Sequence, residues 1–356
     1  MPRSAAVAPD FWSGRRVLVT GVTGFQGAWL ALWLGALGAH VSGLSRREPP
    51  ADSLFAVGGV GRDVTRIDAD VRDFQAVSAA VGECRPEIVV HMAAQSLVPA
   101  SLRDPRETYQ SNLMGTINVL EALRLAGGAR VIVNVTSSLC YEPQTWAWGL
   151  RETDPLGGAD PYSSSKACAE LVSAAYRRAF FGRQGTRLAT ARAGNVIGGG
   201  DWGEGRLVPD LMRAAISGER VRVRDPEAVR PWQHVLDPVS GYLLLAQSLW
   251  ESADHAEAWN FAPVEEHGFS VRFVVEHVAG RWGPDLRWET DPSAPGARRQ
   301  LRLDSSLARA RLGWMPRWNI TQALDRVVDW HQGLKRGQDM RELTLAQIRA
   351  HQANDQ

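Results

Sequence analysis

Short apolar runs alternate with longer amphipathic segments along the first half of the chain. The run at 16–21 (RVLVTG) is rich in β-branched residues and ends in glycine, which is typical of a buried strand. Similar runs predict strands at 40–44, 64–69, 87–92 and 130–136, with helices at 28–37, 74–84 and 108–126. This alternation favours a parallel sheet with helices on both faces. We therefore predict an α/β fold with a Rossmann-type, doubly wound parallel sheet.

The alternation is lost from about residue 201, where tryptophan and proline become more frequent. We predict a dinucleotide-binding Rossmann domain at 11–195, to which some later segments return. A smaller C-terminal substrate-binding cap is expected mainly at 196–348. The polar residues at 349–356 predict a frayed tail.

Composition and charge narrow the class of protein. The 356 residues are 44% hydrophobic and 22% charged, as in a packed globular protein of one large or two interlocked domains. Forty basic and 39 acidic residues leave a net charge of +1, so no overall field would recruit nucleic acid or a membrane surface. The longest apolar stretch, 28–39, is too short to span a bilayer, and we expect no targeting segment. The cysteines, Cys84, Cys140 and Cys168, fit neither a disulfide framework nor a metal site, so we expect a cytoplasmic protein without metal.

A glycine-rich turn follows the first predicted strand and opens the first helix. Its spacing is G-x-x-G-x-x-G, and small residues there would let backbone amides approach a pyrophosphate at the helix N-terminus. We therefore expect NAD or NADP to be bound by Gly21, Thr23, Gly24, Phe25, Gln26 and Gly27.

The ends of the next two strands bear on the choice of cofactor. A carboxylate after the second strand would suit the 2′-hydroxyl of NAD, whereas arginine would suit the 2′-phosphate of NADP. Arg46 and Arg47 stand there, so NAD and NADP both remain open. Asp70, with Val71 beside it, ends the third strand, where a carboxylate can accept a hydrogen bond from the adenine amino group.

The pair Tyr162 and Lys166 is the strongest chemical signal. The two residues are four positions apart and would share a helix face, so that an ammonium could lower the pKa of the phenol. The chain has only two lysines among 40 basic residues, the other being Lys335. Arginine is bulkier and does not lose its proton, so a site that needs a compact ammonium is one where a lysine would persist.

Together with the glycine turn and Asn112, the segments 91–95 (HMAAQ) and 162–166 (YSSSK) resemble the extended short-chain dehydrogenase/reductase superfamily. Two longer segments, 192–202 (RAGNVIGGGDW) and 230–235 (RPWQHV), are similar to the CDP-glucose 4,6-dehydratases within it, and this similarity runs nearly end to end.

The resemblance implies an enzyme that binds a sugar nucleotide and keeps its cofactor tightly bound. It implies catalytic roles for Ser137, Tyr162 and Lys166, of which the last two also contact the cofactor. Further cofactor contacts would come from Ala93, Ala94, Gln95 and Asn112, and substrate contacts from Ser138, Asn195, Arg206, Arg230 and His234. It also implies a homodimer, formed through helices at 108–126 and 163–181.

One segment departs from the pattern of the dehydratases. Where they have Thr-Ser-Asp-Lys-Cys-Tyr, this chain has TSSLCY at 136–141, so both groups that serve the elimination of water are absent. Ser138 is a poor acid, and Leu139 can be neither acid nor base. Glu142 is a possible substitute, and His91 a more remote one.

Three functions therefore remain open. The first is transient oxidation of a hexose at C4 and return of the hydride without loss of water, most simply 4-epimerisation of a CDP-glucose-like substrate. The second is a CDP-glucose 4,6-dehydratase in which Glu142 or a cap residue replaces the missing pair. The third is a non-catalytic protein that binds a nucleotide sugar or acts as a scaffold. Nothing in such a role requires the Tyr162–Lys166 pair.

Overall fold

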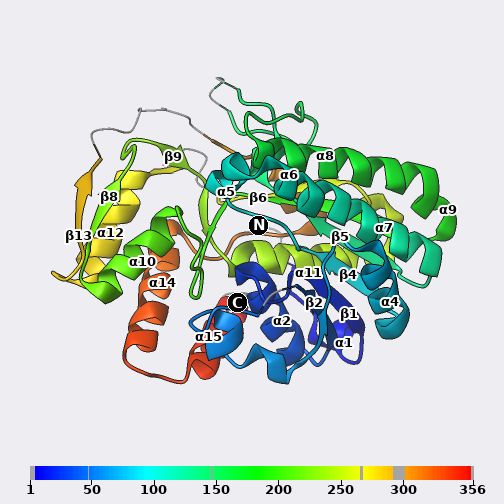
Figure 1. Ribbon diagram of the computed structural model, residues 1–356, viewed down its shortest axis with the longest axis horizontal. Helices are drawn as coiled ribbons and strands as arrows, with labels where there is room; N and C mark the ends of the chain where they lie inside the picture. Colours follow the sequence, from blue (N-terminus) through cyan, green and yellow to red (C-terminus); the bar gives the residue numbers. More distant parts are fainter. Residues whose placement is uncertain are drawn as a thin grey trace.

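A seven-stranded parallel sheet forms the centre of the computed structural model, which describes residues 5–46, 48–144, 146, 148–264, 268–291 and 301–353 (Figure 1). The strand order is β11-β6-β5-β4-β1-β2-β3, so the predicted Rossmann-type parallel sheet is confirmed. The strands are β1 Arg16–Thr20, β2 His40–Ser45, β3 Val64–Asp68, β4 Ile88–His91, β5 Val131–Val135, β6 Arg187–Ala193 and β11 Ala258–Phe261. The chain crosses from one side of β1 to the other between β3 and β4, which places a ligand crevice at the carboxyl ends of β1 and β4.

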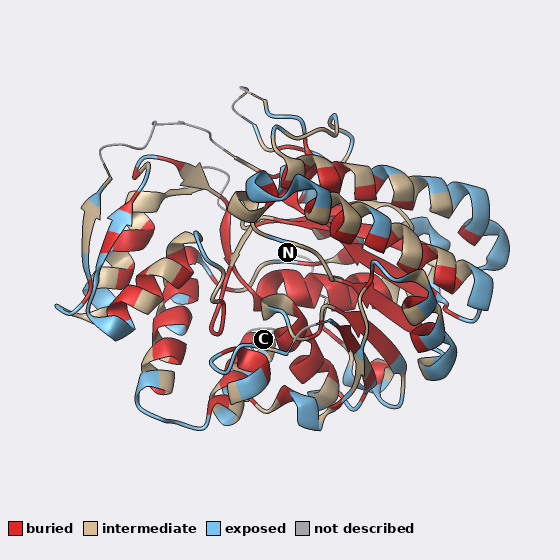
Figure 2. Ribbon diagram, in the orientation of Figure 1, coloured by how far each residue is buried: buried red, intermediate tan, exposed pale blue. Residues whose placement is uncertain are grey.

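Side chains of each strand alternate between two cores, one on each face of the sheet. Val17 and Val19 of β1 pack with α2 (Phe25–Ala36), α11 (Leu236–Glu251) and α15 (Met340–Ala353), whereas Leu18 packs with the opposite layer. The opposite layer consists of α4 (Phe74–Cys84), α7 (Gly115–Ala126) and α8 (Pro161–Tyr176). Figure 2 shows the buried residues concentrated in the strands and on the helix faces that cover them.

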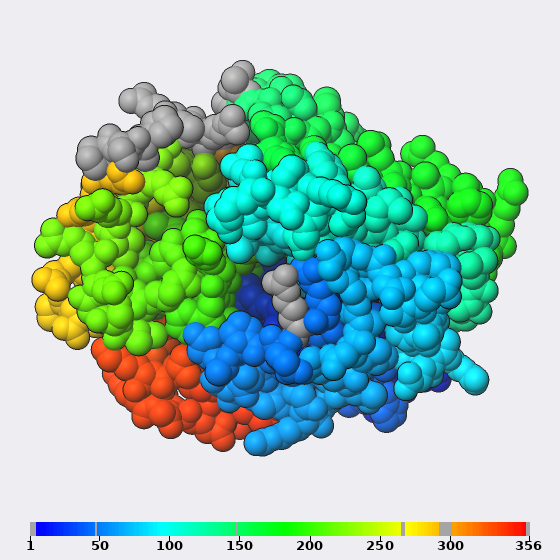
Figure 3. Space-filling model, in the orientation of Figure 1, coloured from blue at the N-terminus to red at the C-terminus, as the bar shows by residue number. Residues whose placement is uncertain are grey.

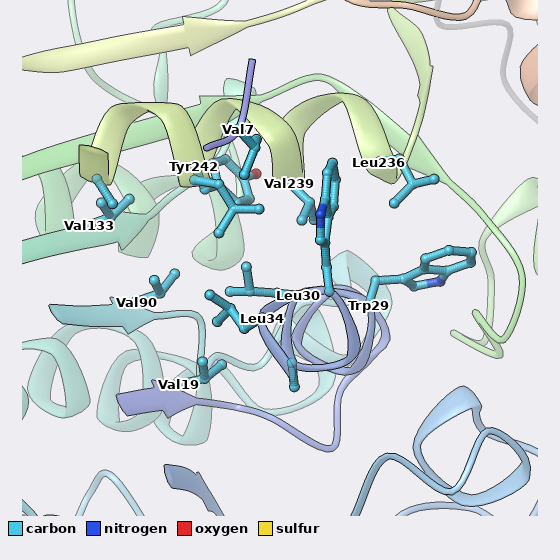
Figure 4. Close-up of a cluster of buried hydrophobic side chains, with 14 of the residues drawn as sticks. Val7, Val19, Trp29, Leu30, Leu34, Val90, Val133, Leu236, Val239 and Tyr242 are labelled. Atoms are coloured by element: carbon cyan, nitrogen blue, oxygen red, sulfur yellow. The ribbon is translucent and has the colours of Figure 1, made fainter. Parts of the chain in front are cut away.

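The first core is built mainly between α2 and α11. Figure 4 shows the α2 side chains Trp29, Leu30 and Leu34 in one cluster with valines of the sheet and with Val239 and Tyr242 of α11. α2 is apolar almost all around because it lies between the sheet, α11 and α15.

The cap has a core of its own beside the sheet, at the left of Figure 1. Its main elements are α10 (Leu207–Ser217), α12 (Val271–Trp282), α14 (Ile320–Lys335) and the parallel pair β8 (Arg220–Val223) and β13 (Arg287–Thr290). Two short pairs complete it: β7 (Asn195–Ile197) with β10 (Trp232–His234), and β9 (Val229–Arg230) with β12 (Phe269–Ser270). α11 and β11, although later in the chain than β8, lie with the sheet.

The long predicted helix at 108–126 is divided into three parts. It consists of α6 (Pro105–Tyr109), a π-helical turn η2 (Gln110–Met114) and α7. The helix expected to run to residue 181 is similarly α8 followed by a π-helical turn, η4 (Arg177–Phe181). The remaining short helices are α1 Pro9–Trp12, α3 Leu54–Val57, η1 Val60–Arg62, α5 Val98–Arg103, η3 Ser138–Cys140, α9 Gly182–Gln184, η5 Ala253–His255 and α13 Ser306–Leu312.

The predicted tail from residue 349 is wrong for residues 349–353, which belong to α15. His351 is fully buried, and its Nε2 lies 2.9 Å from Oδ1 of Asp237 on α11. This contact fixes the end of α15 against the sheet domain, an arrangement that the polar composition of the segment did not reveal. Residues 354–356 lie outside the described part of the chain. No described helix combines the length and the apolar composition needed to cross a membrane.

Candidate active site

Two adjoining cavities open at the carboxyl ends of the strands. The sheet cavity, of about 590 Å³, lies beside the ends of β1, β2 and β4, and the cap cavity, of about 520 Å³, lies between the sheet and the cap. Their shared walls are Phe25, Gln26, Ser96, Leu97, Val135, Thr136, Tyr162 and Arg206. Figure 3 shows the surface hollowed between the light-green cap segments and the blue and cyan segments of the first hundred residues.

The glycine turn forms one wall of the sheet cavity. Gly21 has a φ of 74°, and a Cβ there would lie 2.8 Å from the backbone of Ala93. A Cβ at Gly27 would overlap the carbonyl oxygen of Gly21. Only glycine therefore lets α2 begin so close to the turn. The first amides of α2, at Phe25 to Gly27, have no intrahelical acceptor and line the cavity, which fits a pyrophosphate.

Arg46 and Asp70 line the same cavity at the ends of β2 and β3. Arg46 is paired with Glu107 at 2.6 Å and lies 3.6 Å from Asp70. Burial alone would raise the pKa of Asp70, but hydrogen bonds from Arg72 outweigh it and hold that pKa below its usual value. The positive charge of Arg46 is therefore already balanced by the carboxylates of Glu107 and Asp70. Arg47 lies outside the described residues.

Of the predicted cofactor contacts, Asn112 alone does not line the sheet cavity. Asn112 is buried in η2, where its Oδ1 accepts from the backbone N–H of Gln95 at 2.7 Å. Its Nδ2 donates to the carbonyl of Gln95 and to Oγ of Ser165, both at 2.9 Å. The structure thus corrects the expected role: Asn112 fixes the loop after β4 to α8. The other predicted contacts, which line the cavity, are Gly21, Thr23, Gly24, Phe25, Gln26, Gly27, Arg46, Asp70, Val71, Ala93, Ala94, Gln95, Tyr162 and Lys166.

Tyr162 and Lys166 lie on the first turns of α8, which begins after the N-cap residue Asp160. Tyr162 lines both cavities, and Lys166 Nζ donates to the carbonyl of Val135 at 3.2 Å. Burial lowers the pKa of Lys166 to about 8. Burial also raises the pKa of Tyr162, although a hydrogen bond with Ser137 and the charge of Arg206 oppose this. Ser137 therefore acts on the phenol through a hydrogen bond and Arg206 through its charge, which the sequence did not predict.

The segment that follows β5 forms the wall of the cap cavity beside Tyr162. Ser137 Oγ accepts from the backbone N–H of Leu139 at 3.1 Å, at the start of the 3₁₀ turn η3. Ser138 is 3% exposed and Leu139 is 37% exposed, and both line the cavity. The two positions where the dehydratases carry aspartate and lysine therefore do face the cap cavity here.

Asn195, Arg206 and Arg230, which are predicted substrate contacts, also line the cap cavity. Arg206 Nη1 donates to both carboxylate oxygens of Asp201 at 3.1 Å, and its Nη2 donates to Oγ of Ser96 at 2.9 Å. Arg206 thus belongs to the walls of both cavities and joins the cap to the loop after β4.

His234 lines neither cavity, which corrects its expected role as a substrate contact. The ring is fully buried, 5.7 Å from the ring of Trp29 and 4.7 Å from that of Trp318, and its Nδ1 accepts from the N–H of Leu236. Burial holds the pKa of His234 well below its usual value. It is a neutral core residue at the end of β10.

The two residues considered as substitutes for the missing elimination pair also lie elsewhere. Glu142 is exposed, lines neither cavity, and its carboxylate lies against Gly157. His91 is buried, with its ring nitrogens 2.7 Å from Thr20 Oγ1 and 3.1 Å from Thr116 Oγ1. Burial, with a smaller contribution from Lys166, lowers the pKa of His91 to about 3.

Sequence reasoning missed several charged residues of the cap cavity. Arg222 and Arg224 alternate along β8 and beyond its end, and Glu204 lies in the loop before α10. The alternating RVRVR of 220–224 was a signal for a strand with one charged face. Nothing in the sequence indicated that this face borders the cavity. Within the described residues, no group of three His, Cys, Asp or Glu side chains could hold a metal ion.

The arrangement matches known proteins. The family model of GDP-mannose 4,6 dehydratase matches residues 18–327. The chain belongs to this family. It is 46% identical to the CDP-glucose 4,6-dehydratase of Salmonella typhimurium over 338 residues, which cover 93% of this chain and 94% of the relative. It is 27% identical to the UDP-glucose 4-epimerase of Lacticaseibacillus casei, over 75% of this chain and 83% of that protein.

Solved structures agree with this membership. A UDP-glucose 4-epimerase of Stenotrophomonas maltophila, with NAD and formylated UDP-arabinopyranose, superimposes with a TM-score of 0.79 at 25% identity, over 91% of this chain and 99% of that one. The UDP-glucose 4-epimerase of Thermus thermophilus, in complex with NAD, gives 0.76 at 28% identity, over 89% and 99%. The chain is therefore an enzyme of the sugar-nucleotide epimerase/dehydratase superfamily.

Proposed function

We propose that this enzyme uses NAD to oxidise the hexose of a sugar nucleotide at C4 and then returns the hydride without loss of water. The simplest such reaction is 4-epimerisation of a CDP-glucose-like substrate. The cap, whose main elements α10, α12, α14, β8 and β13 lie within 196–348, would hold the sugar nucleotide in the cap cavity, beside a cofactor in the sheet cavity. Similarity to proteins that are dehydratases and epimerases supports the shared oxidation step.

NAD fits the sheet cavity by the chemistry of its walls. The glycine turn and the first amides of α2 suit the pyrophosphate, and Asp70 suits the adenine. Arg46 is paired with Glu107, which favours NAD over a cofactor with a 2′-phosphate. The nicotinamide would supply the hydride acceptor. We propose that NAD stays bound through turnover, because the same cofactor must return the hydride.

Three side chains would serve the oxidation. Tyr162, as phenolate, would accept the proton of the C4 hydroxyl while hydride leaves C4. The ammonium of Lys166 would favour that phenolate, and Ser137 would hydrogen-bond the same sugar hydroxyl. Arg206 and Arg230, with Asn195, would hold the nucleotide and its diphosphate, because guanidinium groups can bind phosphate through two parallel hydrogen bonds.

The cavity wall at Ser138 and Leu139 is the observation that carries the proposal. Elimination needs an acid for the C6 hydroxyl and a base for the C5 proton, and the described wall after Ser137 offers only a hydroxyl and an isobutyl group there. Glu142 and His91 do not replace them, since neither lines the cavity. A 4-keto sugar formed here would turn in the cavity and accept the hydride on its other face.

A 4,6-dehydratase is the second candidate, favoured by 46% identity over 93% of the chain. The acid and base would then have to come from the cap. Glu204 and Asp225 are carboxylates of the cap cavity for which the described structure shows no ion pair. A non-catalytic role is disfavoured, because it would not need Tyr162 and Lys166 buried beside each other on α8.

We also propose that the enzyme is a homodimer formed through the α7 and α8 helices. Each carries large apolar side chains that are exposed in the single chain: Met114 and Leu125 on or beside α7, and Leu171 and Phe180 on or beside α8. A dimer formed through α7 and α8 would cover these side chains.

The decisive experiment is to incubate the purified enzyme with CDP-glucose and, in parallel, with other common nucleotide sugars. An unchanged product mass with a new proton spectrum of the sugar supports the epimerase. Loss of one water establishes the dehydratase, and Glu204→Gln and Asp225→Asn then identify the acid and base. Stoichiometric binding without any product or reduced cofactor would support the non-catalytic alternative.

A further inference from the structure

A buried ion pair lies behind the proposed catalytic residues. Arg192 on β6 and Glu170 on α8 are each 3% exposed and meet through two parallel hydrogen bonds of 2.9 Å. Glu170 also accepts from Thr136 Oγ1 at 2.5 Å and from Thr190 Oγ1 at 2.6 Å. Four donors thus surround one carboxylate, which offsets much of the cost of its burial.

The network reaches the segment that carries Ser137 from both sides. Thr136 directly precedes Ser137, and Tyr141 directly follows the η3 turn. Tyr141 Oη accepts from Arg192 Nη1 at 2.7 Å and donates to Asn260 Oδ1 at 2.7 Å. The segment between these two anchors contains Ser137, Ser138 and Leu139, all of which line the cap cavity.

The same network holds the helix of the proposed base. Glu170 lies one helical turn after Lys166 and two turns after Tyr162, so all three share a face of α8. Lys166 in turn donates to Val135, the residue before Thr136. α8 and the end of β5 are therefore joined at two neighbouring points.

We propose that Glu170, held by Arg192, is a positioning residue that fixes Ser137 against Tyr162 and places a negative charge one helical turn from Lys166. The pair itself contacts neither cavity. Stability alone does not explain why the chain has this ion pair, because a buried ion pair contributes little more to the stability of the fold than a well-packed apolar pair would. The activity readouts below rest on the proposed oxidation at C4, whereas the titration does not.

The charged and titratable groups around Lys166 decide the sign of the titration. Glu170 and Tyr162 face it from α8, Cys140 from η3, His91 from β4, and Arg192 lies beyond Glu170 on β6. The negative charge of Glu170 opposes the effect of burial on the pKa of Lys166. Replacing Glu170 by glutamine removes that charge and leaves the charge of Arg192 uncompensated. Both changes disfavour the ammonium.

Because the chain has only two lysines, Lys166 can be titrated directly by NMR. The enzyme is labelled with carbon-13 at the lysine ε-carbon, and Lys166→Arg identifies the remaining signal as that of Lys335. Glu170→Gln should lower the pKa of Lys166 by about one unit or more, with no change in the Lys335 signal. An unchanged titration of Lys166 overturns the proposal.

Should Glu170→Gln fail to fold, the double variant Glu170→Met with Arg192→Met removes both charges and keeps the interior filled. This double variant should fold, and the pKa of its Lys166 should still lie below that of Lys166 in the wild type. A titration equal to that of the wild type again overturns the proposal.

Two threonines provide a matched pair for the positioning of Ser137. Thr136→Val and Thr190→Val each remove one hydroxyl donor to Glu170, but only Thr136 adjoins Ser137. The rate of cofactor reduction by substrate, followed by absorbance in a single turnover, should fall about 10- to 100-fold in Thr136→Val. The rate should stay near that of wild type in Thr190→Val. The two variants should lose a similar amount of thermal stability, because each loses one hydroxyl donor to Glu170. Equal rate losses would show a structural role only. If no substrate reduces the cofactor, the proposed function fails while the titration still tests this inference.

Discussion

Arg206 donates a hydrogen bond of 2.9 Å to Ser96 Oγ, and this contact lies at the junction of the sheet cavity and the cap cavity. The cap approaches the sheet domain at this point, so that one guanidinium borders both proposed ligands. The positive charge of Arg206 also opposes the burial that raises the pKa of Tyr162.

Arg206→Ala should weaken binding of the sugar nucleotide by about 10- to 100-fold, because a charge-assisted hydrogen bond to phosphate is lost. Calorimetric titration with the substrate measures this. Arg213→Ala is the matched control. Arg213 lies on α10, the helix that begins directly after Arg206, and it is paired with Asp210 and lines neither cavity. Equal losses in both variants would contradict a binding role for Arg206.

Tyr162→Phe should lower the rate of cofactor reduction by about 10²- to 10⁴-fold, because the ring remains but the proton acceptor is lost. Binding of NAD should change little. Tyr176→Phe removes a phenol on the outer part of α8 that bonds Glu121, and it should leave the rate unaltered. The rate of cofactor reduction in each variant is measured by absorbance in a single turnover. A rate in Tyr162→Phe near that of wild type would exclude Tyr162 as the base.

Introducing Ser138→Asp and Leu139→Lys together should add loss of water to the reaction, because both positions face the cap cavity next to Tyr162. The product mass, measured by mass spectrometry, should then fall by one water for part of the turnover. Each single substitution serves as the control, since elimination needs an acid and a base. Dehydration by the unaltered enzyme would instead refute the proposed 4-epimerase.

Lys166→Met should stabilise the protein while abolishing activity. Burial lowers the pKa of Lys166 from 10.5 to about 8, so below pH 8 the folded state carries a costly buried charge. Between about pH 8 and 10.5 the unfolded state binds the proton and the folded state does not, so this group makes wild-type stability rise with pH there. The free energy of unfolding of Lys166→Met at pH 7 should exceed that of wild type by about 1–3 kcal/mol.

Thermal unfolding across this pH range checks the prediction, and the advantage of Lys166→Met should shrink as the pH rises toward 10.5. Lys335→Met, at an exposed position on α14, is the control and should show no such trend. A less stable Lys166→Met at neutral pH would mean that its hydrogen bond to Val135 outweighs the cost of the buried charge.

Leu171→Arg should convert the proposed dimer into monomers, because Leu171 is 60% exposed on the outer face of α8. Analytical ultracentrifugation measures the mass. Leu102→Arg is the control, since Leu102 is 64% exposed but lies on α5. A wild-type protein that sediments as a monomer would contradict the proposed dimer.

The parts of the site that the sequence determined are those formed by neighbours in the chain. The alternation of short apolar runs and amphipathic segments predicted the parallel sheet, because a strand and the helix after it must bury their apolar faces against each other. The turn from Gly21 to Gly27 and the pair of Tyr162 and Lys166 are local in the same sense, since backbone spacing alone places their members side by side. The carboxyl ends of parallel strands then set these residues at one edge of the sheet.

Only the tertiary structure decided the roles that depend on distant segments. His234 and Asn112 were expected near ligands, but His234 lies between Trp29 and Trp318, and Asn112 bonds the loop after β4. Glu142 was considered as a substitute for the elimination pair, but it lies outside both cavities. The tail at 349–353 likewise belongs to α15 because His351 meets Asp237, 114 positions earlier in the chain. The spacing of residues along the sequence indicates which face of its own helix or strand a side chain occupies. Packing against elements from elsewhere in the chain decides whether that face borders a cavity or the core.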